Sequence, residues 1–292
     1  MCFSHGSHVV ALAGLVFVAT AAASAPAPQP HRIASAFLCT DEYVFRLVPR
    51  ERIAALSYLA ADTHPVVSTI ADRVKGIPLV HETAEEVLSL HPDLVVTYAG
   101  TAVKMQQQLR RAGVPVLEVP WAQSLADVRR ITRILGNRFD ESERANGLLT
   151  EMDTRLADAK RKAASPPVRT LVYEANGYVT AGGVSDEILS AAGLQNMAPR
   201  LSLTRSGTLP VESVLTVSPE LLILNDNGRL PPARANLVLS HPALAALRGH
   251  ALVTRFALTP LLCPGPWSVD VAAPLAGLGR QARALATRAP AP

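Results

Sequence analysis

Short apolar runs alternate along the chain with segments of helical periodicity. The strand-like runs lie at residues 32–36, 53–56, 94–98 and 114–119, and the helix-like segments lie at residues 85–90 and 103–112. The run at 94–98 (LVVTY) is continuous and rich in β-branched residues, which is typical of a strand buried on both faces of a parallel sheet. Regular alternation of this kind predicts an α/β fold with right-handed connections between parallel strands.

The first helix of the series has polar residues at its expected start. Thr40, Asp41 and Glu42 come directly before the apolar residues of the segment 43–47. Such side chains are favoured at helix N-termini because they accept hydrogen bonds from free backbone N–H groups. The sequence therefore predicts that these three residues cap a helix.

One pattern occurs twice without a gap. Residues 85–96 (EEVLSLHPDLVV) align with residues 212–223 (ESVLTVSPELLI), an offset of 212 − 85 = 127. Each copy predicts a helix, a turn made by proline and an acidic residue, and a buried strand. The repeat predicts two similar lobes.

The segment between the two copies has almost no helix breakers. The stretch from Ser124 to Asp127 has the pattern of a capping box. A helix over residues 141–164 would be about 36 Å long at about 1.5 Å per residue, which is enough to cross a lobe. We therefore predict a stiff helical connector at residues 124–165, between an N-terminal lobe at 31–123 and a C-terminal lobe at 166–292.

The N-terminus has the features of an export signal. Residues 9–23 (VVALAGLVFVATAAA) are continuously small or apolar, which suits the apolar region of a signal peptide and is short of the roughly 20 residues of a membrane-spanning helix. Ala21 and Ala23 form a small-x-small cleavage site. Although residues 1–8 contain no Lys or Arg, we expect residues 1–25 to be a cleaved signal peptide and the mature chain to be soluble in the periplasm.

Composition narrows the classes of function. Apolar residues are 49% and charged residues 18% of the 292 residues, which suits two buried cores of ordinary domain size. The net charge of +4 comes from scattered residues without a Lys/Arg block, so a nucleic-acid partner is not expected. The chain has no GxSxG, Walker A, GxGxxG or CxxC motif. We therefore expect a protein that is not an enzyme.

Five features follow one another in a specific order. They are Arg32-Ile33-Ala34-Ser35 with Cys39-Thr40-Asp41-Glu42, the helix-Pro-Asp-strand at 85–96, Gly113-Val114-Pro115-Val116, the connector helix, and Pro264-Gly265-Pro266-Trp267. Together they resemble the ABC-importer substrate-binding proteins of the siderophore, haem and cobalamin type, over about residues 31–285. The resemblance implies two Rossmann-like lobes joined by a single long helix, with a metal chelate held in the cleft between them.

Residues at the carboxyl ends of the predicted strands are the candidate ligand contacts, because open α/β sheets bind ligands there. They are Cys39, Thr40, His81, Tyr98, Trp121, Tyr178, Arg205, Asn225 and Trp267. Each tryptophan either stacks on a flat ligand or covers a sheet edge, and each tyrosine either contacts the ligand or is structural. His81 either ligates haem iron or cobalt or pairs with Glu82, and Arg205 either meets an acidic group such as a haem propionate or lies on a surface loop.

Cleavage of the signal peptide would remove Cys2 and leave Cys39 and Cys263 in the mature chain. These two cysteines lie 263 − 39 = 224 residues apart. Cysteine thiols are readily oxidised in exported proteins. One interpretation is therefore a disulfide between the two lips of the predicted cleft. A second is a pair of thiols that act as soft ligands to haem or a metal. A third is two unrelated buried thiols.

Glu85 and Glu212 each lie seven residues before the proline of their copy of the repeat. In the family that the chain resembles, an acidic residue on each lobe docks against arginines of the membrane permease, and these are the matching positions. Two carboxylates on equivalent faces suit a bipartite ionic contact with a permease dimer. The alternative is that both are solvated glutamates favoured by the helix macrodipole.

The expected partner set is therefore an inner-membrane ABC permease dimer and a small-molecule chelate of iron or cobalt. We expect a monomer without an intrinsic cofactor. A bare zinc or manganese binding protein is the alternative, although the mature histidines show no HxH or HxxxH spacing and such sites need three or four converging ligands. An exported enzyme on the same scaffold is a further alternative.

Overall fold

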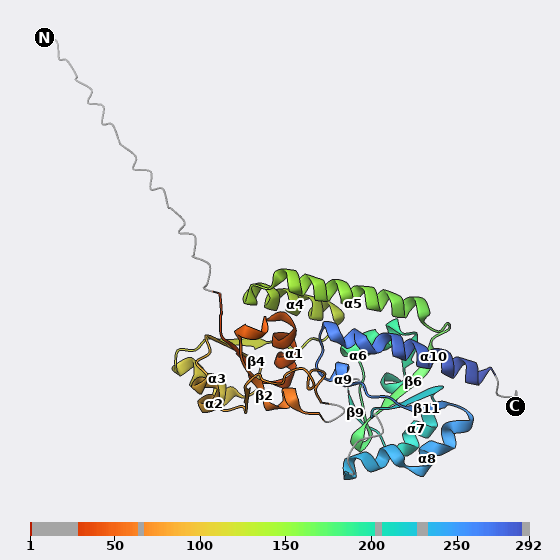
Figure 1. Ribbon diagram of the computed structural model, residues 1–292. Coiled ribbons are helices and arrows are strands. Elements are labelled where there is room, and N and C mark those ends of the chain that lie inside the picture. Colours follow the sequence, from red (N-terminus) through yellow and green to blue (C-terminus); the bar gives the residue numbers. More distant parts are fainter. Residues whose placement is uncertain (2–28, 64–66, 202–205, 227–232, 288–292) are drawn as a thin grey trace.

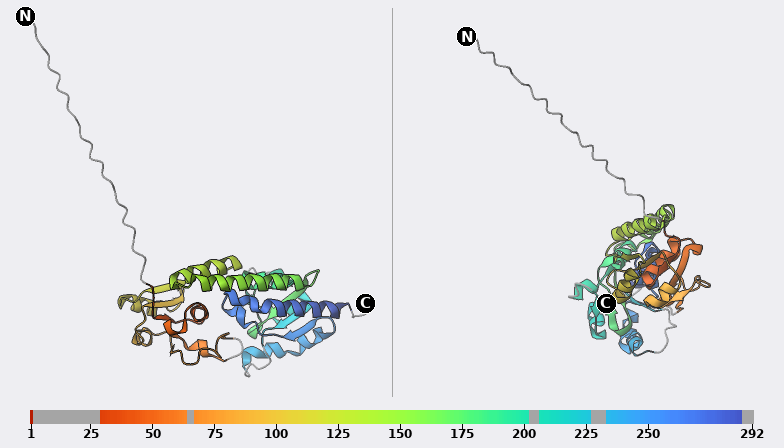
Figure 2. Two further views of the ribbon diagram at one scale, coloured as in Figure 1. Left: turned by 45° about the horizontal axis from the view of Figure 1, so that its top comes forward. Right: turned by 90° about the vertical axis from the view of Figure 1, so that its left-hand side faces the viewer.

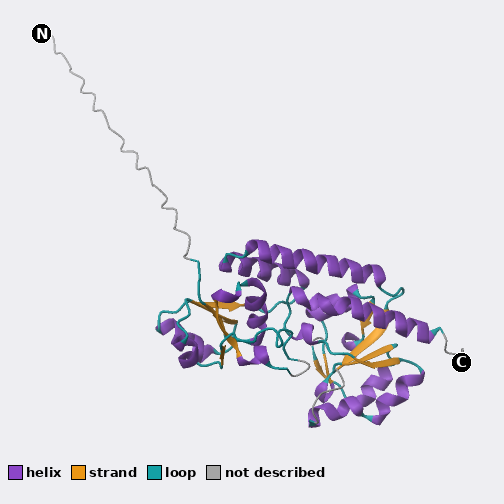
Figure 3. Cartoon of the chain, in the orientation of Figure 1, coloured by secondary structure: helices purple, strands orange, loops and turns teal. Residues whose placement is uncertain are grey.

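The computed structural model describes residue 1 and residues 29–63, 67–201, 206–226 and 233–287. In this part of the chain, most of the strands form two separate parallel sheets with helices packed around them, and two short strands form an antiparallel pair (Figures 1 and 3). The predicted two-lobed α/β fold is confirmed. No helix of the described ranges combines the length and the apolar character needed to span a bilayer. The predicted signal peptide lies outside the described residues, apart from Met1.

The N-terminal lobe is built on a five-stranded sheet in the order β3-β2-β1-β4-β5. Its strands are β1 (Ile33–Ser35), β2 (Ile53–Ser57), β3 (Leu79–Val80), β4 (Leu94–Tyr98) and β5 (Val116–Val119). Its helices are α1 (Leu38–Leu47), α2 (Ala84–Ser89) and α3 (Val103–Arg111), with short 3-10 helices η1 (Arg50–Arg52) and η2 (Tyr58–Ala61). Strand β4 is buried along its whole length between β1 and β5, as its continuous apolar run predicts.

The C-terminal lobe is built on a four-stranded sheet in the order β11-β10-β6-β8. Its strands are β6 (Val168–Tyr173), β8 (Leu194–Asn196), β10 (Leu221–Leu224) and β11 (Leu252–Arg255), beside an antiparallel pair of β7 (Tyr178–Val179) and β9 (Gly207–Thr208). Its α-helices are α6 (Gly183–Ala191), α7 (Val211–Val217), α8 (Pro242–Ala245), α9 (Thr259–Leu262) and α10 (Ala272–Ala286). Its 3-10 helices are η3 (Ala175–Gly177), η4 (Ala198–Leu201), η5 (Arg234–Ser240), η6 (Ala246–Gly249) and η7 (Pro266–Val271).

Two helices connect the lobes. They are α4 (Leu125–Phe139) and α5 (Ser142–Lys162), which lie side by side along one side of the molecule (Figures 1 and 2). The Ser124 hydroxyl accepts a hydrogen bond from the backbone N–H of Asp127 (3.0 Å), so the predicted cap forms at the start of α4. Helix α5 spans 21 residues and packs against α10, α6 and η7 of the C-terminal lobe, while α4 packs against α1 of the N-terminal lobe.

The two copies of the internal repeat also share the same unusual backbone conformation after their helices. Helices α2 and α7 are each followed by a residue at positive φ, His91 at 48° and Ser218 at 46°, in positions that differ by 218 − 91 = 127. Residues other than glycine rarely adopt this conformation, and both of these precede a proline, which excludes a helical conformation at the preceding position. The two copies therefore share one specific turn.

The acidic residue of each Pro-acidic turn holds the neighbouring strand in register. Asp93 accepts a hydrogen bond from the backbone N–H of Arg32 (3.0 Å), just before β1. Glu220 accepts one from the backbone N–H of Arg169 (2.9 Å), at the start of β6. The sequence pattern predicted only a turn; the structure shows that its carboxylate also fixes the start of the adjacent parallel strand.

The predicted cap at the start of α1 is wrong. Helix α1 begins at Leu38, its N-cap is Phe37, and no side chain caps it. Thr40, Asp41 and Glu42 are buried inside the helix, which packs between the sheet and α4. Because the helix starts earlier than the polar run, these side chains point inward and find partners in the core.

Asp41 is the buried acid whose charge state matters most for stability. Its carboxylate accepts hydrogen bonds from the backbone N–H (3.0 Å) and the hydroxyl of Ser57, at the end of β2. Burial raises the pKa of Asp41 to about 7, and the hydrogen bonds from Ser35 and Ser57 oppose this shift. The folded protein thus holds this proton more tightly than the unfolded chain does.

Asp41→Asn is expected to stabilise the protein at alkaline pH. Between pH about 4 and about 7 the folded protein binds more protons than the unfolded chain, so Asp41 lowers the free energy of unfolding as pH rises through this window. Asparagine Oδ1 can still accept from the Ser57 N–H while its Nδ2 donates to the Ser57 hydroxyl, without the charge, so the variant should gain a few kcal/mol at pH 8 and about none at pH 4. Urea unfolding of both proteins at several pH values measures the gain in the free energy of unfolding. If this free energy depends on pH in the same way in both proteins, the prediction is contradicted.

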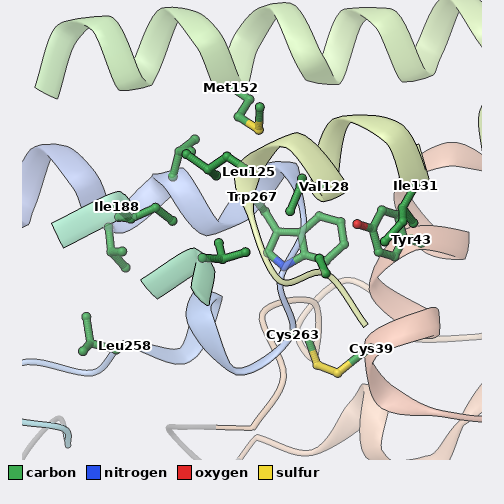
Figure 4. Close-up of a cluster of buried hydrophobic side chains, with 14 of the residues drawn as sticks. Cys39, Tyr43, Leu125, Val128, Ile131, Met152, Ile188, Leu258, Cys263 and Trp267 are labelled. Atoms are coloured by element: carbon green, nitrogen blue, oxygen red, sulfur yellow. A yellow bond between two sulfur atoms is a disulfide. The ribbon is translucent and has the colours of Figure 1, made fainter. Parts of the chain in front are cut away.

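A disulfide joins the lobes. Cys39 at the start of α1 and Cys263 after α9 are bonded, with Cα atoms 4.8 Å apart. Next to it, the Tyr43 hydroxyl donates a hydrogen bond to the Pro264 carbonyl (3.2 Å). Of the three interpretations of Cys39 and Cys263, the disulfide is the one that the structure shows. We call this contact between α1 and the segment around Cys263 the joint (Figure 4).

Candidate functional site

The candidate ligand contacts fall into three groups. His81, Trp121, Tyr178 and Asn225 are exposed or half-buried. Cys39, Thr40, Tyr98 and Trp267 are buried. Arg205 lies outside the described residues.

Phe37, Tyr98 and Trp121 form an aromatic group at the carboxyl ends of β1, β4 and β5. The Tyr98 and Trp121 rings lie 4.2 Å apart between centroids, and the Phe37 ring lies 5.4 Å from Tyr98 and 6.4 Å from Trp121, edge-on to the latter. Trp121 is 44% exposed although it is a large apolar side chain. An exposed indole held by two other rings is a surface on which a flat or bulky ligand stacks favourably.

The Tyr98 hydroxyl is buried beneath this group and has no hydrogen-bond partner in the described part of the chain. Burial raises the pKa of Tyr98 to about 12, so the phenol is protonated at neutral pH. This disfavours the phenolate form that would ligate iron. The burial of this side chain favours the structural alternative over a ligand contact for Tyr98.

His81 lies at the carboxyl end of β3 beside Tyr58, which follows β2. The two ring centroids lie 4.8 Å apart with the ring planes tilted by 30°, and Tyr58 is 48% exposed. The alternative partner expected for His81 was Glu82; the structure pairs its ring Nδ1 with Glu86 instead (3.1 Å). Glu86 also accepts a hydrogen bond from the His81 backbone N–H (2.7 Å), and these contacts lower the pKa of Glu86. The imidazole Nε2 is left for other contacts.

A pocket of about 310 Å³ opens at the carboxyl ends of β6 and β10 in the C-terminal lobe. We call it the α6–α9 pocket; its lining residues are Val172, Glu174, Tyr178, Thr180, Ser185, Leu189, Asn225, Leu258, Thr259, Leu261 and Leu262. Tyr178 and Leu262 are 41% and 50% exposed. The pocket is apolar with a few polar groups, as small-molecule sites are.

Two connections place the aromatic group and the α6–α9 pocket next to the same inter-lobe space. The disulfide joins Cys39, two residues after Phe37, to Cys263, which directly follows α9. At the other side, the Leu125 backbone N–H, four residues after Trp121, donates to Glu187 of α6 (3.1 Å). Aromatic rings from one lobe and an apolar pocket from the other therefore both lie beside the contacts that join the lobes.

Two predicted ligand contacts are structural residues. Cys39 is in the disulfide, which excludes the interpretation of free thiols as soft ligands. Thr40 is fully buried, and its hydroxyl bonds the Phe37 carbonyl and the Ser35 hydroxyl (both 2.8 Å). Both predictions are corrected: α1 begins at Leu38, so these side chains lie inside the lobe.

Trp267 is a third correction. Its side chain is 4% exposed and packs edge-on against Tyr43, 4.8 Å away between centroids, next to the disulfide (Figure 4). The Arg46 guanidinium lies over its other side, 4.5 Å from the ring. The indole therefore packs in the joint and is buried there, which favours a structural role over stacking on a ligand.

Glu85 and Glu212 occupy equivalent places on the two lobes. Each is the second residue of its helix, α2 and α7, and each is exposed. Within the described part of the chain, neither takes part in an ion pair. This placement is compatible both with docking and with solvated helix-terminal glutamates.

A metal centre made of side chains is not present in the described ranges, where no three His, Cys, Asp or Glu residues converge. The alternative of a bare zinc or manganese site therefore finds no support in that part of the molecule.

Tyr58 and Glu174 belong to the site but were not singled out as candidates from the sequence. Both directly follow a strand, Tyr58 after β2 and Glu174 after β6. The rule that ligands meet the carboxyl ends of strands was the signal that would have found them.

Three comparisons with known proteins bear on this arrangement. A family model described as periplasmic binding protein matches residues 64–251. A curated ABC transporter substrate-binding lipoprotein of Bacillus subtilis is 26% identical over 138 residues, which are 46% of this chain. The match spans 42% of that relative's length.

Solved structures share the fold over most of the chain. The apo periplasmic haem-binding protein RhuT from Roseiflexus has a TM-score of 0.70 at 22% identity, covering 86% of this chain and 98% of that one. The haem-binding protein HutB of Vibrio cholerae has a TM-score of 0.69 at 21% identity, covering 85% and 98%. The vitamin B12 binding protein BtuF of Vibrio cholerae has a TM-score of 0.65 at 18% identity, covering 87% and 98%.

Proposed function

This chain belongs to the periplasmic binding protein family, and from that premise we propose that it is the substrate-binding protein of an ABC importer. It captures a metal chelate between its two lobes and delivers it to a permease in the inner membrane. The chelate is a ferric siderophore, haem or a cobalamin. The protein binds its cargo and does not transform it.

The observation that carries this proposal is the pairing of the aromatic group with the α6–α9 pocket. An exposed tryptophan on one lobe and a pocket of about 310 Å³ on the other both flank the contacts that join the lobes. That volume is at the lower end for small-molecule sites, so a bulky ligand seated in it extends toward the aromatic group. The structural relatives, a haem-binding protein and a vitamin B12 binding protein, support a ligand of that size.

Delivery is assigned to the outer face of the two lobes. Glu85 and Glu212 stand at the same position of equivalent helices and are exposed. Two carboxylates so placed match two equivalent basic patches on a permease dimer. The proposal places the mature chain in the periplasm as a monomer, with residues 1–25 removed on export.

Binding of a coloured chelate tests the proposal directly. The mature protein is incubated separately with haem, cyanocobalamin and ferric hydroxamate, and each sample is passed through gel filtration. We expect one chelate to be retained at about one equivalent. Trp121→Ala should weaken its binding about 10-fold or more, since large buried aromatic contacts dominate such interfaces.

Ile134→Ala is the matched control, because Ile134 on α4 is also a large exposed apolar residue, at 48%, away from the pocket. It should bind the chelate like the unmodified protein. If every sample elutes colourless, the chelate proposal is wrong. Retention of zinc or manganese in the same experiment would instead favour the bare-metal alternative.

A further inference from the structure

Glu174 lines the α6–α9 pocket at the end of an inner strand of the sheet. It directly follows β6, which lies inside the sheet between β10 and β8. Around it the pocket is apolar, with walls from Val172, Leu189 and the leucines of the α9 region, Leu258, Leu261 and Leu262. A carboxylate at the end of a central strand, inside an apolar pocket, is exposed to whatever ligand enters there.

The contacts of the Glu174 carboxylate come from neutral groups. Asn225 Nδ2 donates to one oxygen (3.0 Å) and the Thr180 hydroxyl donates to the other (3.3 Å). The Asn225 amide cannot turn round, because its Oδ1 accepts a hydrogen bond from the Leu258 backbone N–H (2.8 Å). These bonds fix the carboxylate in place without supplying a positive charge.

This makes Glu174 different from other partly buried carboxylates of the protein. Arg46 pairs with Glu42, Arg52 with Glu141 (2.8 Å) and Arg255 with Asp226. In the described part of the chain, Glu174 has no such ion pair. Asp41 is also held by neutral groups, but it lies inside the N-terminal lobe, whereas Glu174 lines a pocket.

Leaving the charge uncompensated has a cost. Burial raises the pKa of Glu174, and the hydrogen bonds from Asn225 and Thr180 only partly oppose the shift. A carboxyl group with a raised pKa and a specific place in a pocket is typical of a functional site. The cost of its charge is removed when a cation from outside the protein binds next to it.

We propose that Glu174 selects the cargo, and that the α6–α9 pocket takes a chelate carrying a protonated amine, which forms an ion pair with the Glu174 carboxylate. A chelate that presents a carboxylate at this point is repelled. The inference rests on the proposed chelate-binding function and narrows it to one class of ligand.

Two ferric chelates that differ only in this group test the proposal. Ferrioxamine B is a ferric trihydroxamate with a terminal ammonium, and its N-acetyl derivative has the same chelate without the charge. Affinities of the mature protein for both are measured by quenching of tryptophan fluorescence. We expect the ammonium form to bind at least about 10-fold more tightly than the acetylated form.

Glu174→Gln separates charge from structure. Glutamine can accept from Asn225 and donate to Thr180, so the pocket keeps its shape while the charge is lost. The variant should bind the ammonium form about 10-fold more weakly and the acetylated form unchanged. Glu51→Gln makes the same change of net charge at an exposed position on the other lobe, in η1 before β2, and it should change neither affinity.

Other outcomes overturn the inference in distinguishable ways. An equal loss of affinity for both probes in Glu174→Gln would mean that the residue only braces the pocket. Retention of haem or cobalamin by the unmodified protein without binding of either hydroxamate would leave the chelate function standing and refute the amine selectivity. Failure to bind any chelate would refute both.

Discussion

Replacing Glu85 and Glu212 together by alanine is expected to abolish chelate uptake in cells while leaving chelate binding unchanged. Both carboxylates lie on helices α2 and α7, outside the α6–α9 pocket and outside the aromatic group. Removing one should weaken docking to one half of the permease, and removing both should reduce uptake about 10- to 100-fold, since paired ionic contacts govern encounter and orientation. Uptake of radiolabelled chelate by a deletion strain carrying each variant measures the effect.

Glu143→Ala is the matched control. Glu143 lies in the first turn of α5 and is also exposed, so it has the same relation to a helix terminus as the two docking candidates. If the two glutamates serve only the helix macrodipole, all three variants should behave alike, with a small loss of stability and normal uptake. Loss of chelate binding in the double variant would instead place these residues near the ligand.

Removing the disulfide is expected to cost the protein about 2–5 kcal/mol of its free energy of unfolding. The bond joins residues 224 positions apart, so it restricts the unfolded chain strongly, and large loops give the largest such effect. Both cysteines are buried, at 4% and 3% exposure, so Cys39→Ala with Cys263→Ala avoids burying a new hydroxyl. Urea unfolding monitored by circular dichroism measures the loss.

Reduction of the unmodified protein provides the control for the side-chain change. In dithiothreitol it should lose a similar amount of stability, whereas the double alanine variant should be indifferent to the reductant. Equal unfolding midpoints for the oxidised protein and the double variant would show that the joint is held by packing around Trp267 alone. If the double alanine variant is much less stable but dithiothreitol does not destabilise the unmodified protein, the loss of stability comes from the missing sulfur atoms and not from the missing bond.

Most of the architecture was predictable because it follows from periodicity. The apolar run at 94–98 is β4 without a shift at either end, and the repeat at 85–96 and 212–223 is α2 with β4 and α7 with β10. The connector helix predicted at 141–164 is α5 at Ser142–Lys162. Hydrophobic period and helix-ending prolines are local properties, so one sequence is enough to locate them.

The side-chain directions were not predictable in the same way. Trp121 and Trp267 both follow predicted strands in loops that contain proline, yet Trp121 is 44% exposed and Trp267 is 4% exposed. The difference arises because the segment after α9 is drawn against α1 at the joint. This contact is between residues more than two hundred positions apart and depends on how the two lobes pack.

The prediction that the polar residues near the start of α1 cap this helix was wrong for a related reason. Thr40, Asp41 and Glu42 have the composition of a helix cap, but tertiary contacts from Ser57 and Thr69 supply partners that only the folded lobe contains. A capping preference is a weak local term, and burial of the apolar residues Leu38 and Cys39 outweighs it.

The joint also determines the kinetics of ligand exchange. A binding protein whose lobes swing apart must pass through an open state before it can load or unload, and its observed rates contain that step. Here a covalent bond and helix α5 both connect the lobes, which restricts their separation. For the proposed chelate-binding function, loading is then expected to be a single bimolecular step whose rate rises linearly with chelate concentration, without a plateau from a gating transition. Unloading is expected to require work from the proposed permease, because a wide reopening of the lobes is restricted.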